Sequence, residues 1–323
     1  MEKKITIIIP NYNGIEYMEN CLKSLTLQSC TDFKVLVVDN GSYDGSRELV
    51  ENEYPETELF CLEENLGFCM AVNAGICRAN TPFVLLLNND TTVHRDFVMN
   101  LLTAIEKDEK IFSVGAKMLS MKEPDKIDDA GNLYCALGWA FALGKGKKAD
   151  NYDRPSRIFA ACGGAAIYRR SLFREIGYFD ENHFAYLEDI DIGYRADIYG
   201  YTNYYEPAAI VYHAGSGFSG SRYNEFKIRL SSKNSVYMIY KNMPILQVIL
   251  NLPFLMIGYL MKIVFFSLRG YGYLYIQGVF KGIGMGFTKS GKAHKVPFRW
   301  KHLGAYCRIQ LDLWWNMIRR LAG

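Results

Sequence analysis

Short apolar runs alternate with amphipathic stretches over the first hundred positions of the chain. The continuous apolar runs lie at 5–9, 33–39, 58–62 and 83–88. The stretches between them have the spacing of helices, as at Tyr17, Leu22 and Leu25. Continuous apolar strands separated by helices are typical of a parallel sheet covered on both faces. The pattern therefore predicts an α/β fold with a Rossmann-like, mostly parallel sheet and flanking helices.

Polar and small residues follow each apolar run. They are Pro10, Asn11 and Tyr12 after the first run, Asp39 at the second, Asn65 and Gly67 after the third, and Asn88, Asn89 and Asp90 at the fourth. Ligands of open parallel sheets bind beyond the carboxyl ends of the strands. Asn, Asp and Gly are also ordinary turn formers. Because Asp39 and Asp90 bring carboxylates to one rim, we favour a ligand site there.

The chain is less regular after residue 120. Residues 120–158 are rich in Gly and Lys and weakly patterned, and we expect a loop. From 159 to 200 the pattern predicts an apolar strand, a Gly163-Gly164 step, a short helix and an acidic helix start.

Charge divides the chain into two regions. Residues 1–225 contain 22 Lys+Arg and 33 Asp+Glu, a net of −11, whereas 226–323 contain 15 Lys+Arg and one acid, a net of +14. We expect a first domain at 1–225 and a basic, apolar helical tail at 226–323.

The tail contains twenty uncharged residues, 242–261. That length suits a spanning helix, but Pro253, Lys262 and basic residues on both sides oppose a single crossing. We expect a helical region lying on the anionic inner leaflet, peripheral or monotopic, to which each basic residue contributes on the order of 1 kcal/mol. The alternative is a soluble helical subdomain or an oligomer interface that buries the same surface.

Two further features indicate that the first domain faces the cytoplasm. The eight cysteines form no C-x-x-C pair, and most lie in apolar runs, so we expect buried free thiols in a reducing compartment. The residues before Pro10 contain too few apolar positions for a secretory signal.

Seven motifs occur between residues 4 and 225: IIIPNYNG, VVDNGSYDGS, ENLGFCMAVNAGI, LLLNND, GGAAIYRR, GYFDENHFAYLEDIDIGYR and VYHAGSG. In these motifs and their order the chain resembles the inverting GT-A family-2 glycosyltransferases, and more narrowly their rhamnosyltransferase-like branch. The resemblance implies a nucleotide-sugar donor, a divalent metal and a catalytic carboxylate.

The resemblance also implies the donor-binding residues. Asp39 would accept hydrogen bonds from the nucleotide base, which suits a charged acceptor, with Pro10, Asn11 and Tyr12 as the opposite wall. Asn65 and Gly67 would shape a loop near the nucleotide, and Asn89 belongs to the same rim. Gly163 and Gly164 would let the backbone approach the donor sugar closely.

The metal site is expected at Asp90 and His213. By resemblance Asp90 is the last residue of a D-x-D element that holds Mg²⁺ or Mn²⁺ on the diphosphate. Asn88 stands where the first Asp would be, so we expect modest metal affinity without donor. His213 would be a further metal ligand or a diphosphate contact. An Asx turn at Asp90 and a structural role for His213 are the alternatives.

The general base is expected in YLEDIDIGYR. Inverting transfer needs a carboxylate that takes the proton of the acceptor hydroxyl. The resemblance favours Asp189 as this base, with Glu188 supporting the acceptor site. Acidic residues also favour helix N-termini, which could account for Asp191.

The sequence thus predicts transfer of a sugar, L-rhamnose from dTDP-rhamnose, to a lipid-linked saccharide of the bacterial cell surface. A UDP-hexose donor, or a membrane-docked binder of nucleotide sugars without catalysis, are the alternatives. A homo-oligomer stays open, and no feature resembles a nucleic-acid-binding fold. GSGFSG (215–220) matches G-x-G-x-x-G but lacks the acidic residue about 20 positions later, so we reject a dinucleotide site.

Overall fold

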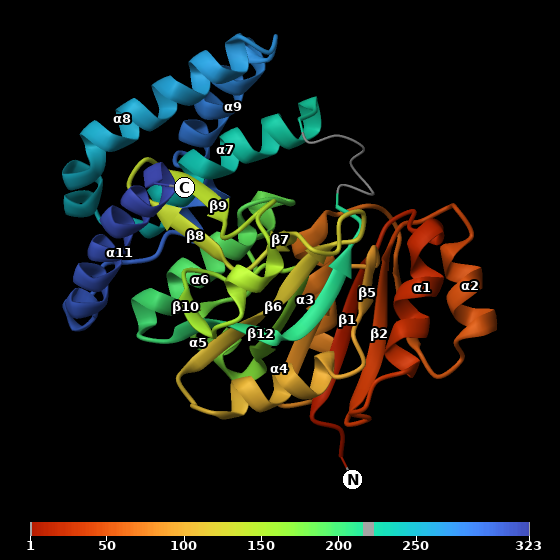
Figure 1. Ribbon diagram of the computed structural model, residues 1–323. Helices are drawn as coiled ribbons and strands as arrows, with labels where there is room; N and C mark the ends of the chain where they lie inside the picture. The colour runs from red at the N-terminus through yellow and green to blue at the C-terminus, as the bar shows by residue number, and fades with distance from the viewer. Residues whose placement is uncertain (1, 216–222, 323) are drawn as a thin grey trace.

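A ten-stranded mixed sheet forms the centre of the first part of the chain (Figure 1). The structure, a computed structural model, describes residues 2–215 and 223–322. The main path of the sheet runs β10-β12-β6-β11-β4-β1-β2-β3, with β5 paired to β12 and β7 to β6. Most of the rejected GSGFSG segment and the end of VYHAGSG lie outside the described residues.

The four predicted strands are present and parallel to one another. They are β1 (Ile5–Asn11), β2 (Phe33–Asn40), β3 (Glu58–Leu62) and β4 (Phe83–Leu87). Their carboxyl ends share one edge of the sheet, because β1 lies in register between β2 and β4. The prediction of a mostly parallel α/β fold is confirmed.

The remaining strands make the sheet mixed. They are β5 (Thr91–Val93), β6 (Ile111–Ser120), β7 (Ile127–Asp129), β10 (Ser156–Ile158), β11 (Ala165–Arg169) and β12 (Thr202–His213). Strand β11 is antiparallel to both β4 and β6. The prediction of a strand before the Gly163-Gly164 step is wrong: the strand begins after Gly164, and the apolar residues before it pack on helix α6 (Glu188–Tyr199) and the neighbouring strands.

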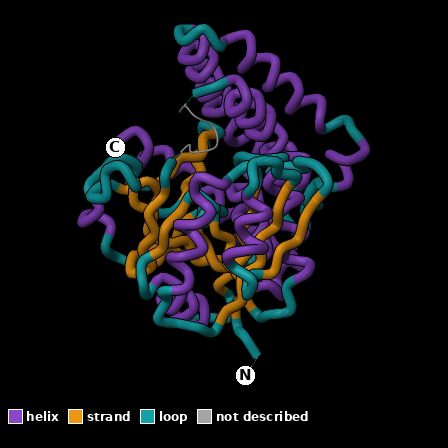
Figure 2. The backbone as a smooth tube through the Cα atoms, turned by 90° about the vertical axis from the view of Figure 1, so that its right-hand side faces the viewer, coloured by secondary structure: helices purple, strands orange, loops and turns teal. Residues whose placement is uncertain are grey.

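Helices cover both faces of the sheet (Figure 2). Side chains of one face pack on α1 (Ile15–Thr26), α2 (Ser46–Glu53) and α4 (Phe97–Glu106). The other face packs on α3 (Phe68–Arg78), α5 (Phe173–Ile176) and α6 (Glu188–Tyr199). Within β1, Ile7 and Ile9 belong to the first layer and Ile8 to the second, which is why this strand is apolar throughout.

The segment predicted as a loop, 120–158, is largely ordered into short elements. It contains β7 and the antiparallel hairpin of β8 (Asn132–Cys135) and β9 (Trp139–Ala142). Strands of three or four residues are too short to show a two-residue period, so the loop prediction was wrong. Tyr134 and Leu133 anchor the hairpin by packing against the tail.

The tail is helical, as predicted. Its helices are α7 (Glu225–Asn242), α8 (Ile245–Ser267), α9 (Gly272–Met285), α10 (Lys289–Ala293) and α11 (Leu303–Ala322). Ile309 and Leu313 of α11 pack with Tyr134 and Ile190 of the first part. Short 3-10 turns occur at η1 (Ala149–Tyr152), η2 (Arg170–Leu172), η3 (Glu181–His183) and η4 (Trp300–His302). The division at 225/226 into two domains stays a prediction.

Helix α8 has its polar side chains facing the protein and its apolar side chains facing outward. Gln247 and Asn251 are buried, where they bond to Tyr194 and Gln310. The outward residues include Ile245, Ile249, Met256 and Leu260, each more than half exposed. Within the described residues, α8 is the one helix long and apolar enough to cross a membrane, and 17% of its most apolar window is buried.

The cysteines only partly match the expected burial. Cys21, Cys30, Cys69 and Cys135 are buried, but Cys61, Cys77 and Cys307 are exposed. All eight are free thiols.

Candidate active site

Asp39 lies at the carboxyl end of β2 and is fully enclosed by hydrogen-bond donors. Its carboxylate accepts from Asn11 Nδ2 at 2.8 Å, the Ser42 N–H at 2.9 Å and Arg47 Nε at 2.5 Å. Burial raises the pKa of Asp39, but these donors outweigh it and the net pKa lies below the usual range. With these donors in place the Asp39 side chain is 0% exposed, and the predicted base contact stays a prediction.

The loops after β2 and β3 are joined through amides. Asn40 Nδ2 donates to Asn65 Oδ1 at 3.0 Å, and the same oxygen accepts from the Gly67 N–H at 3.0 Å. Gly67 has φ 88°. A Cβ there would lie 2.6 Å from the Phe184 ring, so glycine is required for the close approach of Phe184, in the loop before Glu188, to this turn.

Asn89 is tied to the first loop. Its Nδ2 donates to Asn11 Oδ1 at 2.7 Å, directly over Gly14, where a Cβ would lie 1.9 Å from Asn89 Nδ2. Tyr12 of this loop packs edge-on against Tyr43, with ring centroids 6.5 Å apart. Pro10 precedes Asn11 at the end of β1. The predicted rim residues of β1, β2 and β4 therefore form one connected edge.

The Gly163-Gly164 step lies at the end of β4. The Asn88 N–H donates to the Gly164 carbonyl at 2.9 Å, and a Cβ on Gly164 would lie 3.0 Å from Asn88 Nδ2. A Cβ on Gly163 would lie 3.3 Å from the Phe68 ring. A side chain at Gly164 or Gly163 would therefore press on Asn88 or Phe68, while contact with a donor sugar stays a prediction.

The two predicted metal ligands meet. Strand β5, which follows Asp90, pairs with the end of β12, and His213 Nε2 lies 3.3 Å from Asp90 Oδ1. His213 Nδ1 lies 2.7 Å from Asp128 Oδ2. Burial lowers the pKa of His213, but its bonds to Asp128 and Asp90 raise it to about 9.

This pair fits a divalent cation in its donor chemistry. A carboxylate oxygen and an imidazole nitrogen face each other; the oxygen suits Mn²⁺, and the nitrogen, which is softer than this metal prefers, must give up its proton to bind it. Asp128 holds the second imidazole nitrogen, as carboxylates commonly do behind metal-bound histidines. No group of three or more His, Cys, Asp or Glu side chains within 2–215 and 223–322 is arranged to hold a metal. If Asp90 and His213 ligate a metal, as predicted, the further ligands would come from a bound diphosphate or water.

Glu188 and Asp189 begin helix α6, and their environments differ. Glu188 is buried, and its Oε2 has no hydrogen-bond partner within the described chain. Asp189 is partly exposed, and its carboxylate accepts from Asn132 Nδ2 at 2.8 Å and from the Ile190 N–H at 2.7 Å. Burial raises the pKa of both carboxyl groups, and the neighbouring Asp189 raises that of Glu188 further. One of the pair is therefore suited to take up a proton near neutral pH.

The loop before Glu188 has a strained backbone. Phe184, Tyr186 and Leu187 have φ values of 65°, 69° and 67°. Such conformations cost of order 1–3 kcal/mol each and persist only where the surroundings impose them. Asn234 of α7 supplies this restraint, because its Nδ2 donates to the carbonyls of His183, Ala185 and Tyr186 at 3.0, 2.9 and 2.8 Å.

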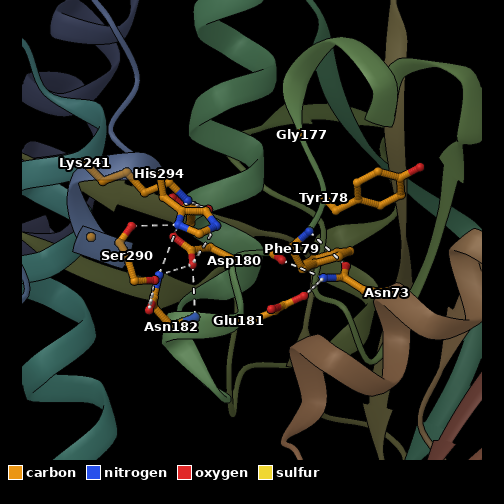
Figure 3. A network of polar contacts seen from close by, with 12 residues as sticks. Asn73, Gly177, Tyr178, Phe179, Asp180, Glu181, Asn182, Lys241, Ser290 and His294 are labelled. Carbon is orange, nitrogen blue, oxygen red and sulfur yellow. Dashed lines mark hydrogen bonds and ion pairs between the residues drawn. The ribbon is translucent and has the colours of Figure 1, made fainter. Parts of the chain in front are cut away.

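Asp191 belongs to a buried ionic network between α6 and α7 (Figure 3 shows the Asp180 side of it). Lys241 Nζ lies 2.8 Å from both Asp191 Oδ2 and Asp180 Oδ2. Arg195 donates to Asp191 as well, at 2.8 Å. Tyr237 donates to Asp180 at 2.8 Å. The network is structural, so Asp191 does more than favour a helix start.

Comparison with known proteins identifies the family. Residues 6–177 match the family model described as glycosyl transferase family 2. The chain belongs to this family.

The chain is similar to N-acetylglucosaminyl-diphospho-decaprenol L-rhamnosyltransferase of Mycobacterium tuberculosis, with 27% identity over 240 residues that cover 66% of this chain and 76% of that protein. The fold is similar to that of the Pyrobaculum calidifontis mannosyltransferase PcManGT, crystallised with GDP-Man and Mn²⁺ (TM-score 0.54, 17% identity, 96% of this chain and 88% of that one). It is also similar to GalNAc-T7, crystallised with UDP, GalNAc and Mn²⁺ (TM-score 0.59, 17% identity, 73% of this chain but only 47% of that one). The predicted GT-A fold and family-2 membership are confirmed.

Sequence reasoning missed several residues that this family-2 glycosyltransferase brings to the site. Asp128 and Asn132 come from the segment predicted as a loop, and they contact His213 and Asp189. Asn234 and Lys241 come from the tail. The one available signal was IDDAGN (127–132), where two acids and an amide surround a glycine, but nothing in the sequence relates that segment to β12 or α6.

Proposed function

We propose that the protein is a metal-dependent, inverting glycosyltransferase that transfers L-rhamnose from dTDP-rhamnose to a lipid-linked saccharide at the cytoplasmic face of the plasma membrane. Family membership supports glycosyl transfer. The mycobacterial relative, named for L-rhamnosyl transfer to a diphospho-decaprenol-linked sugar, supports the donor sugar and the class of acceptor.

One observation carries the proposal: residues 128–132 contact both halves of the chemistry. Asp128 bonds to His213, which faces Asp90, and Asn132 bonds to Asp189. A segment of five residues spans at most about 18 Å when extended. The predicted leaving-group side and the predicted base therefore both border this short segment, which supports their acting on one donor and one acceptor.

The residues then have distinct roles. Asp189 takes the proton of the acceptor hydroxyl while that oxygen attacks the anomeric carbon from the side opposite the leaving group. Glu188, whose Oε2 is buried without a partner among the described residues, would bond to an acceptor hydroxyl only after the surrounding loop opens. Asp90 and His213 would hold Mg²⁺ or Mn²⁺, which when bound stabilises the charge of the departing nucleoside diphosphate. Asn11, Asn65, Gly67 and Asn89 shape the donor side of the site.

Donor identity is tested by thermal stabilisation. The purified protein is heated with dTDP-rhamnose, UDP-glucose and UDP-N-acetylglucosamine, each with Mn²⁺ and with EDTA. At a ligand concentration of 100 times Kd, binding stabilises by about 2.7 kcal/mol. We expect a Mn²⁺-dependent shift with dTDP-rhamnose. A shift with a UDP-sugar alone would keep the mechanism and overturn rhamnose as the sugar.

Catalysis is tested by transfer to a diphosphate-linked acceptor, with the anomeric configuration of the product read by NMR. Inversion predicts a configuration opposite to that of the donor. Asp189→Asn should remove turnover and keep the donor-induced thermal shift. Donor binding with no turnover by the folded wild-type protein would favour the non-catalytic binder instead.

Membrane docking is the second part of the proposal. Helix α8 supports this docking, because its exposed face is apolar and its buried face carries polar side chains. Such an exposed apolar face suits lipid rather than water. Exposed Phe280 of α9, Phe287 just after that helix and Trp315 of α11 add to the apolar surface. The basic residues of the tail suit an anionic leaflet.

Vesicle flotation tests the docking. We expect binding to vesicles that contain phosphatidylglycerol, weakened by high salt. The triple variant Ile249→Ser/Met256→Ser/Leu260→Ser should lose binding, whereas Leu27→Ser/Met99→Ser, at exposed apolar sites of the first part, should bind like the wild type. If the wild type forms a soluble dimer and does not bind vesicles, the apolar outer face of α8 is an oligomer interface.

A further inference from the structure

A cleft of about 780 Å³ lies between the turn after β9 and the end of α11. Five of its lining residues are cationic, against two acidic ones; the cations are Lys126, Lys145, Lys147, Arg319 and Arg320. The lysines come from 126–147 and the arginines from 319–320, so the two groups are brought together only in the folded protein.

Three of these cations have no ion-pair partner among the described residues. Lys126 pairs with Glu123, and Lys145 pairs with Asp128 at 2.7 Å. Lys147, Arg319 and Arg320 form no ion pair with any described residue. Arg320 instead lies over the ring of Phe141, 5.5 Å from its centroid, which holds the guanidinium at the cleft. Converging cations in a concave site attract an anion, and Arg and Lys are suited to phosphate oxygens.

The cleft connects the chemistry to the apolar surface. Its wall includes Asp128, whose carboxylate bonds to His213 of the predicted metal pair. At the other end, α11 carries exposed Leu311, Trp315 and Ile318 in the turns before Arg319. Figure 1 shows α11 beside the β8–β9 hairpin and below α8.

We propose that this cleft binds the diphosphate of a lipid-linked acceptor, a proposal that rests on the proposed function. In a prenyl-diphosphate-linked sugar, the diphosphate joins the sugar at one end to the apolar prenyl chain at the other. The protein offers the same order: Asp189 and Glu188 for the sugar hydroxyl, the cationic cleft for the diphosphate, and the outer face of α8 and α11 for the chain.

The kinetic test compares two acceptors and two triple variants. One acceptor is a sugar diphosphate on a short prenyl chain, and the other is the same sugar on a plain alkyl chain, both in neutral detergent. The variant Lys147→Ala/Arg319→Ala/Arg320→Ala removes the free cations. The control Lys289→Ala/Lys292→Ala/Lys301→Ala removes three exposed cations elsewhere in the tail, with the same change of net charge.

We expect the cleft variant to raise the KM of the diphosphate acceptor at least about tenfold, because each hydrogen bond to a charged group is worth roughly a factor of ten or more in affinity. The KM of the donor and of the alkyl glycoside should stay within twofold, and the control variant should match the wild type. A raised donor KM would assign the cleft to the donor. Equal loss for both acceptors, or no loss, would also overturn the proposal.

A binding measurement separates this proposal from the proposed function. Decyl diphosphate is titrated calorimetrically into wild type and both variants, in EDTA and then with saturating dTDP and Mn²⁺. We expect binding to wild type and control, weakened in the cleft variant and unaffected by dTDP. Binding of decyl diphosphate without any sugar transfer would overturn the proposed function and keep the anion site. Sugar transfer by a wild-type protein that binds no decyl diphosphate would keep the proposed function and overturn the anion site. Competition between dTDP and decyl diphosphate would show that the cleft is a donor subsite.

An anionic lipid surface is the other source of phosphate. The wild type and the cleft variant are therefore compared in flotation with phosphatidylglycerol vesicles. Equal flotation supports a site for the acceptor diphosphate. Loss of flotation in the cleft variant but not in the control variant would make the cleft a headgroup contact and overturn the proposal.

Discussion

Replacing Lys241 by methionine removes the cation at the centre of the network between α6 and α7 while keeping a side chain of similar volume. Lys241 is 3% exposed at its side chain, and both of its carboxylate partners, Asp180 and Asp191, are 0% exposed. The buried charges of the network, those of Lys241, Arg195, Asp180 and Asp191, sum to zero, and the variant leaves a net charge of −1. Breaking a buried pair in this way costs about 3–5 kcal/mol, because a charge stays buried without compensation.

The cost should depend on pH, and the sign follows from the pKa shifts. Burial raises the pKa of Asp180, but Lys241 outweighs it, so the net pKa is lowered; the pKa of Asp191 is lowered as well, with Arg195 and Lys241 opposing burial. Their contribution to stability is present above the ordinary Asp pKa of about 4 and is lost as pH falls through the lowered folded values. Without Lys241 the pKa of Asp180 should rise, because its burial is no longer offset.

The assay is thermal and urea unfolding of Lys241→Met and of the control Lys289→Met, an exposed lysine of α10, at pH 7 and pH 5. We expect a loss of about 3–5 kcal/mol at pH 7 and a smaller loss at pH 5, where Asp180 of the variant can bind a proton. The control should stay within about 0.5 kcal/mol of wild type. A loss below about 1 kcal/mol at pH 7, or one that does not shrink at pH 5, would refute the reasoning.

Three further predictions concern the site. Asp189→Asn should lower kcat by about 10²- to 10⁴-fold. In the wild type, kcat/KM should fall with decreasing pH, with an apparent pKa above the ordinary Asp range, because burial raises the pKa of Asp189. A pH-independent profile would contradict this role. Asp90→Asn should abolish the Mn²⁺-dependent part of the donor-induced thermal shift, as EDTA should in the wild type, and an unchanged shift would remove Asp90 from the metal site. Asn234→Ala should lower stability by about 1–3 kcal/mol, because the Ala185 and Tyr186 carbonyls lose the amide donor while the His183 carbonyl keeps the Ala185 N–H. It should also lower kcat through the strained loop before Glu188, and a normal kcat in a destabilised variant would limit Asn234 to a structural role.

Much of the donor side could be predicted because it is local. Each of β1 to β4 is a continuous apolar run, and the residues that follow each run reach the same edge whatever the rest of the chain does. Asn11, Asp39, Asn65 and Asn89 were therefore found from strand ends alone. Their partners were not: that Arg47 and Ser42 enclose Asp39 depends on the path of the loop after β2.

The other half of the site depends on pairings across long separations. Asp128 meets His213 because β7 and β12 both pair with β6, and Asn132 meets Asp189 because the β8–β9 hairpin packs on α6. The hairpin and β7 are too short to show a period, so the sequence alone indicated a loop. From the sequence, Asp191 could be explained as an acid at a helix start. Its partner Lys241 lies fifty residues away in the tail, so no local pattern pointed to the ionic network.

By itself the sequence determined the parallel core, the family and the residues at the strand ends, since periodicity and motifs are properties of neighbouring residues. The tail's composition likewise indicated an apolar, basic helical region. Only the tertiary structure decided which face of α8 is turned outward, which cations share the cleft beside Asp128, and what holds the strained loop before Glu188. These features arise from contacts between segments that fold together from distant parts of the chain, and no local pattern encodes such contacts.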